Sequence, residues 1–430
     1  MRGAGSLRDS IAVSEPKESS QGGLGRVWST LRIPHYTPFF TANFAQFLFS
    51  HVAMMSMYWL MTSLTDSRFY ITLVSFFQGV TVFVLSPWGG VIADRVAKKN
   101  LLVAGRLGMV ALVVVMGALV EAGVAKIVHL WIGSVVGGVI MSLMQPASQT
   151  FVYDLVGRDR LENAVALNAT AGGVANVFGP AAGGMIVAAV GVASSFFISG
   201  AGMFMAAGLL LAIPVAGRTA REIERQNPVE EIREGFAWVW NDRGVRLVML
   251  ASCMALFNGA ISSMRPVYAR FVLDVGEVGL GWMSASHGAG TVLMAVALSM
   301  LPRFRFVGLW ITGGMFGFAL CILLYSFAFS YSYILFVEFL LGATGQVWNV
   351  TVMAGLQLAV PEHMRGRVIS MVFMAAQLGF VGQPIVGALA DRFGDQIALG
   401  IFGAIPSVVL FLMLLTRSSV LRRVGEPAPR

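Results

Sequence analysis

Long apolar runs constrain this chain more than any other feature of its sequence. About twelve segments of roughly 20 to 27 mostly apolar residues follow one another, and each could cross about 30 Å of hydrocarbon as an α-helix. Hydrophobic residues make up 57% of the chain and charged residues only 12%, and the mean hydropathy is +0.75. These values lie far outside the range of soluble globular domains, so the sequence predicts an all-α integral membrane protein.

The apolar segments fall into two groups of six, separated by one charged stretch. We expect helices of the first group at about 38–63, 69–93, 100–121, 127–153, 163–190 and 193–215. Those of the second group are expected at about 246–272, 279–301, 306–328, 332–359, 367–390 and 396–416. The predicted domains are a disordered cytoplasmic tail (1–33), a six-helix bundle (34–217), a cytoplasmic linker (218–245), a second six-helix bundle (246–416) and a C-terminal cytoplasmic tail (417–430).

An internal repeat relates the two groups. A gapless shift of 204 positions pairs Gly138 with Gly342 and Gly183 with Gly387. Such a parallel repeat is typical of two halves related by an axis along the membrane normal. The second part of the linker spaces apolar residues at helical intervals, which predicts an amphipathic helix on the cytoplasmic membrane face. A simple tether without a regulatory role is the alternative for this linker.

The distribution of positive charge predicts the topology. If the N-terminus is cytoplasmic, 25 of the 30 Lys and Arg residues fall in cytoplasmic segments. Four of them lie around the turn after the second segment: Arg95, Lys98, Lys99 and Arg106. The bias predicts a multi-pass protein of the cell (inner or plasma) membrane with both termini in the cytoplasm. Because the basic residues are spread through membrane loops, no nucleic-acid partner is expected.

The turn between the second and third segments reads PWGGVIADRVAKKN, from Pro87 to Asn100. It resembles the signature loop of the major facilitator superfamily, Gly-x-x-x-Asp-Arg-x-Gly-Arg-Lys/Arg, through four matching residues: Gly90, Asp94, Arg95 and Lys99. The stretch 146–170 resembles the branch of that superfamily that contains enterobactin exporters and macrolide efflux proteins. The resemblance covers about residues 35–416 and implies twelve transmembrane helices in two pseudo-symmetric six-helix bundles, the major facilitator fold.

The resemblance also implies a conformational latch. In the family, the loop aspartate faces the start of the eleventh helix, and the loop arginine pairs with an acid at the end of the fourth. Asp94, Arg95 and Asp154 occupy these positions here. A carboxylate at a helix N-terminus complements the helix dipole, and an ion pair can hold two helices in one conformer. The alternative is that these charges only anchor the topology.

A Gly-Pro motif in the fifth segment predicts a bend at a packed interface. Its residues are Gly179, Pro180, Gly183 and Gly184, and Pro384 and Gly387 repeat it in the eleventh segment. Proline removes a helix hydrogen bond, and glycine lets a neighbouring helix approach. The motif resembles the fifth-helix motif of superfamily antiporters, which implies export. A close-packed, kinked helix with a purely structural role is the alternative.

Polar side chains inside the apolar segments predict a substrate cavity. Because polar groups are costly in hydrocarbon, they are expected to face a cavity or another helix. The resemblance implies a cavity lined by the first, fourth, seventh and tenth helices, and the candidates fall on these four: Asn43, Gln46, Ser50, Gln145, Gln149, Asn258, Ser262, Gln346 and Asn349.

Charged and titratable residues in the segments predict a gate and a proton path. Arg265 and Glu338 are placed near the outer side, where we expect them to pair and to help close an outer gate. An Arg265 that only reaches the interface is the alternative. Glu338 and His51 are the candidate proton carriers, although a buried, hydrogen-bonded structural histidine is the preferred interpretation of His51. His287 is a weaker candidate of the same kind.

Together these features favour a secondary active transporter that works by alternating access. The preferred interpretation is a proton-coupled exporter, or antiporter, of a moderately large, partly apolar organic compound, drug-like or siderophore-like. Uptake of a nutrient or metabolite by the same fold, a transport-inactive receptor and a lipid-moving protein stay open as alternatives. No catalytic motif, cofactor motif or paired metal ligands are found, so an enzyme is not expected. The expected partners are a small-molecule substrate, protons and the lipid bilayer, with the protein as a monomer.

Overall fold

The computed structural model describes residues 30–158, 160–215, 255–301, 306–359 and 378–416, together with the single positions 240, 246, 249, 250 and 253. Within these residues the chain forms helices and no strands. Both tails, nearly all of the linker and the start of the predicted eleventh segment lie outside the described residues. The predicted amphipathic linker helix is among these parts.

The first group of helices closely follows the predicted segments. Its members are α2 (Tyr36–Leu64), α3 (Arg68–Arg95), α4 (Lys98–Glu121), α5 (Ile127–Val156) and α6 (Leu161–Leu211). Helix α6 contains both the fifth and the sixth predicted segments. They are separated at Gly191, whose φ of 82° and ψ of 169° are not helical. A residue without a Cβ adopts such dihedrals with little steric cost, so the chain can change direction there.

The second group contains one irregular segment. Its members are α9 (Ala255–Val267), the π-helix η1 (Tyr268–Val272), α10 (Gly276–Ser299), α11 (Val307–Tyr325), α12 (Tyr331–Ala359), α14 (Gly379–Phe393) and α15 (Asp395–Thr416). The described residues thus contain eleven α-helices where the sequence predicted twelve, because α6 joins two predicted segments. Eight of these helices are long and apolar enough to cross a membrane.

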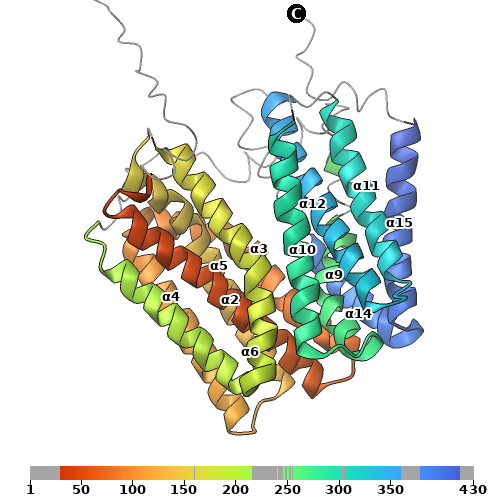
Figure 1. Ribbon diagram of the computed structural model, residues 1–430, viewed down its shortest axis with the longest axis horizontal. Coiled ribbons are helices and arrows are strands. Elements are labelled where there is room, and N and C mark those ends of the chain that lie inside the picture. Colours follow the sequence, from red (N-terminus) through yellow and green to blue (C-terminus); the bar gives the residue numbers. More distant parts are fainter. Residues whose placement is uncertain are drawn as a thin grey trace, which may run out of the picture.

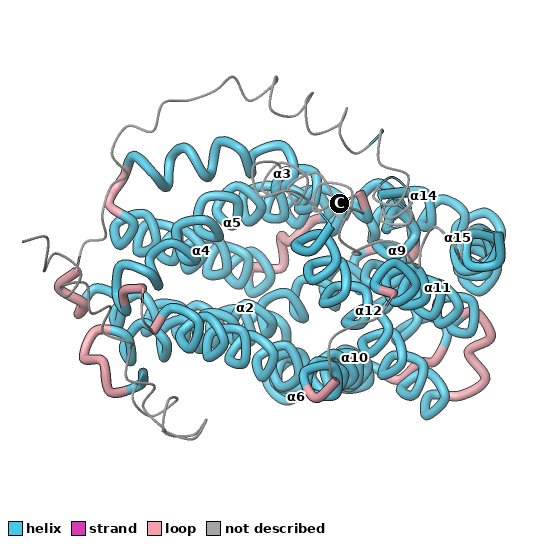
Figure 2. Tube along the Cα trace, turned by 90° about the horizontal axis from the view of Figure 1, so that it is seen from above, coloured by secondary structure: helices cyan, strands magenta, loops and turns pink. Residues whose placement is uncertain are grey.

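The two groups of helices lie side by side. Figure 1 shows α2–α6 on one side and α9–α15 on the other, closer together at the lower end than at the upper end. Seen from above, α6 lies beside α10 (Figure 2), and α3 packs on α14 across the same boundary. A continuous apolar core joins the groups at this boundary, with Met61 and Leu130 from one side and Met264 and Leu341 from the other.

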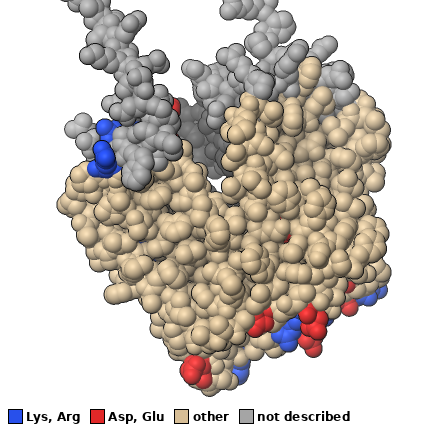
Figure 3. Space-filling model, viewed as in Figure 1, with Lys and Arg blue, Asp and Glu red and all other residues tan. Residues whose placement is uncertain are grey.

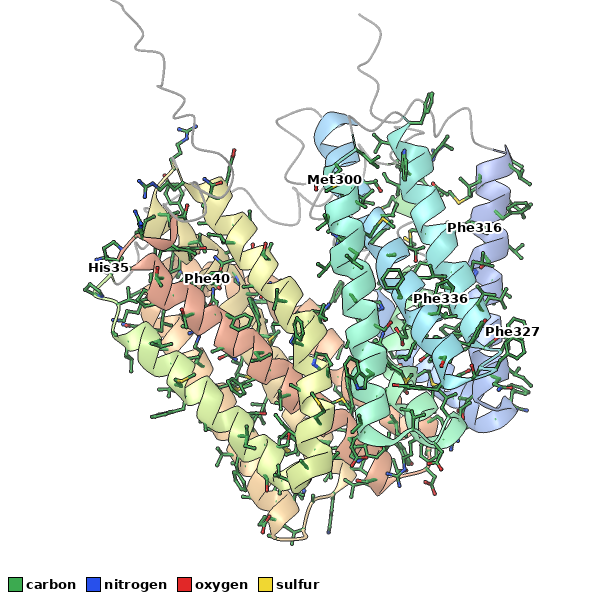
Figure 4. The ribbon with its side chains drawn as sticks, viewed as in Figure 1. His35, Phe40, Met300, Phe316, Phe327 and Phe336 are labelled. Atoms are coloured by element: carbon green, nitrogen blue, oxygen red, sulfur yellow. The ribbon has the colours of Figure 1, made fainter. Side chains whose placement is uncertain are left out.

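The outer surface is suited to contact with lipid. Large apolar side chains are exposed on it; Phe327 and Phe336, both on the second group (Figure 4), are 51% and 60% exposed. Figure 3 shows that the visible charged residues gather toward the ends of the molecule, and that the middle of this face is almost free of them. An uncharged, apolar band between charged ends is typical of a multi-pass membrane protein.

Candidate functional site: two cavities and a buried ion pair

Two adjoining cavities lie among the helices. The first, of about 280 Å³, lies inside the first group, between α2, α3, α4 and α5, with one residue from α6. The second, of about 580 Å³, lies between the groups and is lined from α2, α3, α5, α9, α11, α12 and α14. Both are lined by Met54, Tyr58, Gln78 and Met141, so they share a wall. We refer to the two adjoining cavities together as the central space; both groups of helices line its second part.

The predicted cavity residues divide between these spaces. Four line the first cavity: Asn43, Gln46, Ser50 and Gln145. Two line the second: Ser262 and Asn349. Gln149 and Gln346 line neither cavity, although Gln149 lies only one turn beyond Gln145 on α5. The side chain of Asn258 is outside the described part of the chain.

Arg265 on α9 and Glu338 on α12 form a bidentate ion pair. Arg265 Nε donates to Glu338 Oε1 at 2.6 Å, and Arg265 Nη2 donates to Oε2 at 2.9 Å. The Glu338 side chain is fully buried and that of Arg265 is 14% exposed. Paired hydrogen bonds between a guanidinium and a carboxylate are strong and directional, and in a buried site they offset much of the cost of removing both charges from water.

Two more side chains complete this cluster. The Tyr325 hydroxyl of α11 donates to Glu338 Oε1 at 3.2 Å, and His287 Nδ1 of α10 lies 3.4 Å from Oε2. Four helices of the second group thus converge on one carboxylate. His287 was only a weak candidate from the sequence, and Tyr325 was not predicted. Tyr325 is the polar residue at the end of its apolar segment, at a depth like that of Glu338, and this signal could have identified it.

His51 belongs to a different environment from Glu338. It lines the first cavity, and its Nδ1 donates to the carbonyl oxygen of Phe47 at 2.8 Å. This hydrogen bond orients the ring and, in the neutral form, leaves Nε2 as the unprotonated nitrogen. Glu338 lines neither cavity. Of the two candidate proton carriers, only His51 borders the central space in this conformation.

The turn after α3 makes different contacts from those implied by the resemblance. Asp154 at the end of α5 accepts a hydrogen bond from Lys98 Nζ at 2.8 Å, whereas the side chain of Arg95 is exposed. The implied Arg95–Asp154 pair is therefore wrong for this structure. The reason is geometric: Lys98 is the first residue of α4 and lies against α5, while Arg95 ends α3.

The other latch residues are placed as follows. Lys99 Nζ donates to the carbonyl oxygens of Leu211, at 2.9 Å, and of Ile213, at the C-terminal end of α6. A cation there complements the helix dipole and satisfies carbonyls that have no partner within the helix. Gly90 lies within α3. The side chain of Asp94 and the residues it was expected to face lie outside the described part of the chain.

A second latch, which the sequence analysis missed, lies at the opposite end of the helices. Asp391 at the end of α14 accepts hydrogen bonds from Ser67 Oγ at 2.6 Å, from the backbone N–H of Arg68 at 2.7 Å and from that of Phe69 at 3.1 Å. Arg68 also pairs with Asp395, with Nε to Oδ1 at 3.0 Å. A carboxylate from the second group thus caps the N-terminus of a helix in the first.

The signal for this second latch is present in the sequence. Residues 387–392 read GALADR and repeat the Gly-x-x-x-Asp-Arg pattern of residues 90–95, GVIADR. The first copy follows the second predicted segment, and the second copy ends the eleventh. The repeat places the same chemistry at opposite ends of the helices.

The Gly-Pro motif lies where α6 packs against two neighbours. A Cβ on Gly183 would lie 2.9 Å from Met55 Cβ on α2, and a Cβ on Gly281 of α10 would lie 2.8 Å from the Pro180 carbonyl oxygen. Gly179 packs against His51, and Gly184 against the backbone of α10. Pro180 itself lies in continuous helix, since Gly191 is the residue of α6 with non-helical dihedrals.

The matching residues of the second group pack in the same way. Gly387 of α14 lies against α3, where an added Cβ would meet the backbone of Arg68 and Phe69 at 2.8 and 2.9 Å. Pro384 lies inside α14, one turn before it. Both copies of the motif therefore stand at the boundary between the two groups of helices.

Comparison with known families decides the class of protein. The profile of the family described as transmembrane secretion effector (MFS_3) matches residues 26–426, nearly the whole chain. The chain belongs to this family. Its membership in the major facilitator superfamily, expected from the loop after the second segment, is thereby confirmed. The protein is a transporter-family membrane protein, and the family consists of transporters rather than enzymes.

Several relatives are similar to the chain at low identity. The enterobactin exporter EntS of Citrobacter koseri is 23% identical over 384 residues, which cover 85% of this chain and 87% of the relative. The staphyloferrin A transporter of Staphylococcus aureus is 22% identical, with 85% and 92% covered. The uncharacterized MFS-type transporter YfiS of Bacillus subtilis is 24% identical, with 78% and 81% covered.

Solved transporter structures share the fold of this family member. The nucleoside transporter NupG superposes with a TM-score of 0.72 at 12% identity, covering 89% of this chain and 98% of NupG. The peptide transporter POT in complex with sulfate gives a TM-score of 0.72 at 13% identity, with 90% and 96% covered. At such identities the likeness concerns the arrangement of the helices and not the substrate.

Proposed function

We propose that this protein is a secondary active transporter that exports a moderately large, partly apolar organic compound in exchange for protons, by alternating access. The observation that carries the proposal is the central space, lined in part by polar residues, together with the contacts of Asp391 and Arg68 that join the two groups of helices at one end. Rocking of two halves requires a binding site at their boundary and contacts that hold the halves together at one end.

The proposed topology follows the predicted domains. Twelve spans form two pseudo-symmetric six-helix bundles, at 34–217 and 246–416, joined by the cytoplasmic linker at 218–245. The gapless internal repeat and the paired Gly-Pro motifs support this division. Both termini lie in the cytoplasm of a cell whose inner or plasma membrane holds the protein as a monomer. With this orientation, the Asp391 latch closes the outer side.

Proton coupling is assigned to Glu338, with Arg265, Tyr325 and His287 as its partners, and to His51 in the cavity. A carboxylate can carry a proton only if its ion pair opens, so rocking of the halves would have to separate Arg265 from Glu338 during the cycle. The position of the pair close to the π-helix η1 supports this role, because such segments often mark sites of local rearrangement.

The direction and the class of substrate are supported by the relatives. Two of them carry the names enterobactin exporter and staphyloferrin A transporter. The second cavity, of about 580 Å³, is large enough for a ligand of several rings. Uptake of a nutrient or metabolite would use the same fold, and the experiment below separates it from export.

The test uses purified protein in liposomes that enclose a pH-sensitive dye, under an imposed proton gradient. Macrolides, organic dyes, catechol siderophores, sugars and amino acids are added in turn. Proton movement that begins only with a bulky organic compound supports the proposal. A response to sugars or amino acids alone would indicate uptake, and no proton movement with any compound would refute proton-coupled export and favour a receptor or a lipid-moving protein.

Matched variants make the test specific. Glu338→Gln should abolish compound-driven proton movement, whereas Glu121→Gln, on the exposed end of α4, should behave like the wild type. If Glu338→Gln still exchanges protons at the wild-type rate, the assignment of the proton to Glu338 is wrong. His51→Gln then becomes the variant to examine.

A further inference from the structure

One buried cation takes no part in the contacts described so far. Arg106 was expected among the cytoplasmic charges around the turn after α3, but it lies about eight residues into α4, roughly 12 Å from the start of that helix. Only 1% of its surface is exposed, and it is among the largest fully buried side chains of the described residues. A cation at such a position is costly unless its charge is compensated.

The protein partners of Arg106 are neutral. Its Nη2 donates to Asn43 Oδ1 at 2.5 Å, and its Nη1 donates to the Ala206 carbonyl oxygen at 2.9 Å. Its Nε is buried without a hydrogen-bond partner. The ion pairs of the described residues are Arg68–Asp395, Lys98–Asp154 and the cluster around Glu338, and none of them includes Arg106. The charge is therefore oriented by the protein but not neutralised by it.

This guanidinium lines the first cavity, which contains no Asp or Glu. Gln46 of the same lining also has a buried side-chain oxygen without a partner. Much of the remaining wall consists of six methionines: Met54, Met57, Met109, Met116, Met141 and Met144. Methionine side chains are flexible and polarizable, so such a wall adapts to apolar ligands of different shapes. The cavity combines one fixed positive charge with an adaptable apolar wall.

We propose that the first cavity binds the anionic group of an amphipathic organic anion, with Arg106 as its anchor. A guanidinium offers planar, paired N–H donors that match a carboxylate or a similarly delocalised anion. The apolar body of the ligand packs on the methionines and extends past the shared wall at Tyr58 and Met141 into the second cavity. The inference deepens the proposed transport function and rests on it, since it specifies the chemical class of the cargo.

The alternative role for Arg106 is purely structural, because it connects α4 to α2 and α6. The two roles differ in their dependence on charge. Asn43→Asp would place a carboxylate beside Nη2, where the oxygen of Asn43 now lies at 2.5 Å. An internal ion pair preserves or strengthens a structural connection, but it neutralises the anchor for an incoming anion.

The experiment measures equilibrium binding to purified protein without any gradient. The probes are two matched pairs: pyrenebutyrate and 1-naphthaleneacetate, each with its uncharged methyl ester. We expect the wild type to bind the acids more tightly than the esters by about 10- to 100-fold, the ratio given by a charge-assisted hydrogen-bonded contact. Arg106→Gln and Asn43→Asp should abolish this preference, and Arg106→Lys should retain part of it.

Control variants and outcomes keep the test decisive even if Arg106→Gln fails to fold. Asn100→Asp, exposed at the start of α4, introduces the same charge outside the cavity and should leave the preference intact. Asn43→Asp should unfold at or above the wild-type temperature. The proposal is overturned if the wild type prefers neither acid, or if Asn43→Asp keeps the preference. If a neutral compound still drives proton movement in the liposome experiment, the transport function is supported and only the anion site is refuted.

Discussion

At the scale of single residues, the protein places two buried arginines in contrasting environments. Arg265 meets a carboxylate that also accepts a hydrogen bond from Tyr325 and lies close to His287, while Arg106 meets an amide and a backbone carbonyl. The first arrangement is complete within the protein and the second lacks a countercharge. Residues of one type therefore serve different purposes according to what surrounds them.

Removing one partner of the ion pair between Arg265 and Glu338 should destabilise the second group. Glu338→Gln leaves Arg265 buried without a countercharge, and we expect a loss of about 3–5 kcal/mol in the free energy of unfolding. The double variant Glu338→Gln, Arg265→Gln should recover most of this loss because neither charge then remains. Thermal unfolding of the purified variants measures both effects. If the double variant is no more stable than Glu338→Gln alone, the unpaired charge of Arg265 is not the cause of the lost stability.

The contact of Asp154 gives a second prediction at this scale. Lys98→Met should lower the free energy of unfolding by about 1–3 kcal/mol, since it removes a charged hydrogen bond from a largely buried carboxylate. Arg95→Met, at an exposed position of the same turn, should change it by less than about 0.5 kcal/mol. Denaturant unfolding compares the two. The reverse order of effects would mean that Arg95 is the true partner.

At the scale of elements, small residues set the distance between helices. Helix α6 contacts α2 through Gly179 and Gly183 and contacts α10 through the adjacent face with Pro180 and Gly184, and α14 contacts α3 through Gly387. Because glycine has no side chain, two helix backbones can approach closely at these crossings, which explains why the motif lies there. Packing, rather than a break in α6, is what this motif provides.

Gly183 and Gly208, both on α6, offer a matched comparison. Gly183→Ala puts a Cβ at 2.9 Å from Met55 Cβ, and we expect this overpacking to cost about 1–3 kcal/mol. An added Cβ on Gly208 meets no atom within 4 Å, so Gly208→Ala should stabilise the helix by up to about 1 kcal/mol. The temperatures of unfolding should shift in opposite directions. Equal shifts in the two variants would mean that close packing of Gly183 against Met55 does not determine stability there.

At the scale of the whole molecule, the two copies of the Gly-x-x-x-Asp-Arg pattern lie at opposite ends of the helices. The described contacts of the second copy join α14 to the start of α3, and those groups of helices are closest at that end. Alternating access requires contacts that hold one end and can be exchanged for contacts at the other. We propose that the second copy holds this end and that the first copy supplies the contacts at the other end.

Weakening the second latch should therefore shift the conformational equilibrium. Spin labels at the exposed positions Val124 and Val278, one on each group, would report the separation at this end, after replacement of Cys253 and Cys321. Asp391→Asn removes the charge from three hydrogen bonds, and we expect the population with the longer distance to rise by up to about 10-fold. Arg392→Gln is the neighbouring control, and an unchanged distance distribution in Asp391→Asn would contradict the latch.

Much of the architecture could be predicted from the sequence because its signals are local. Apolar runs of spanning length located the helices to within a few residues, and the loop residues identified the superfamily. The contact between Arg265 and Glu338 could be anticipated for a related reason. Two opposite charges at one depth in an apolar medium have few other ways to be stabilised.

Other features depended on which faces of the helices meet, and packing alone decides that. The sequence could not tell that Lys98 rather than Arg95 reaches Asp154, because both are basic residues of one short turn and differ only in the direction in which their helices carry them. Nor could it tell that Arg106 points into a cavity. Hydropathy and charge counts describe a residue and its neighbours in the chain, whereas burial and partners come from side chains brought together across distant segments.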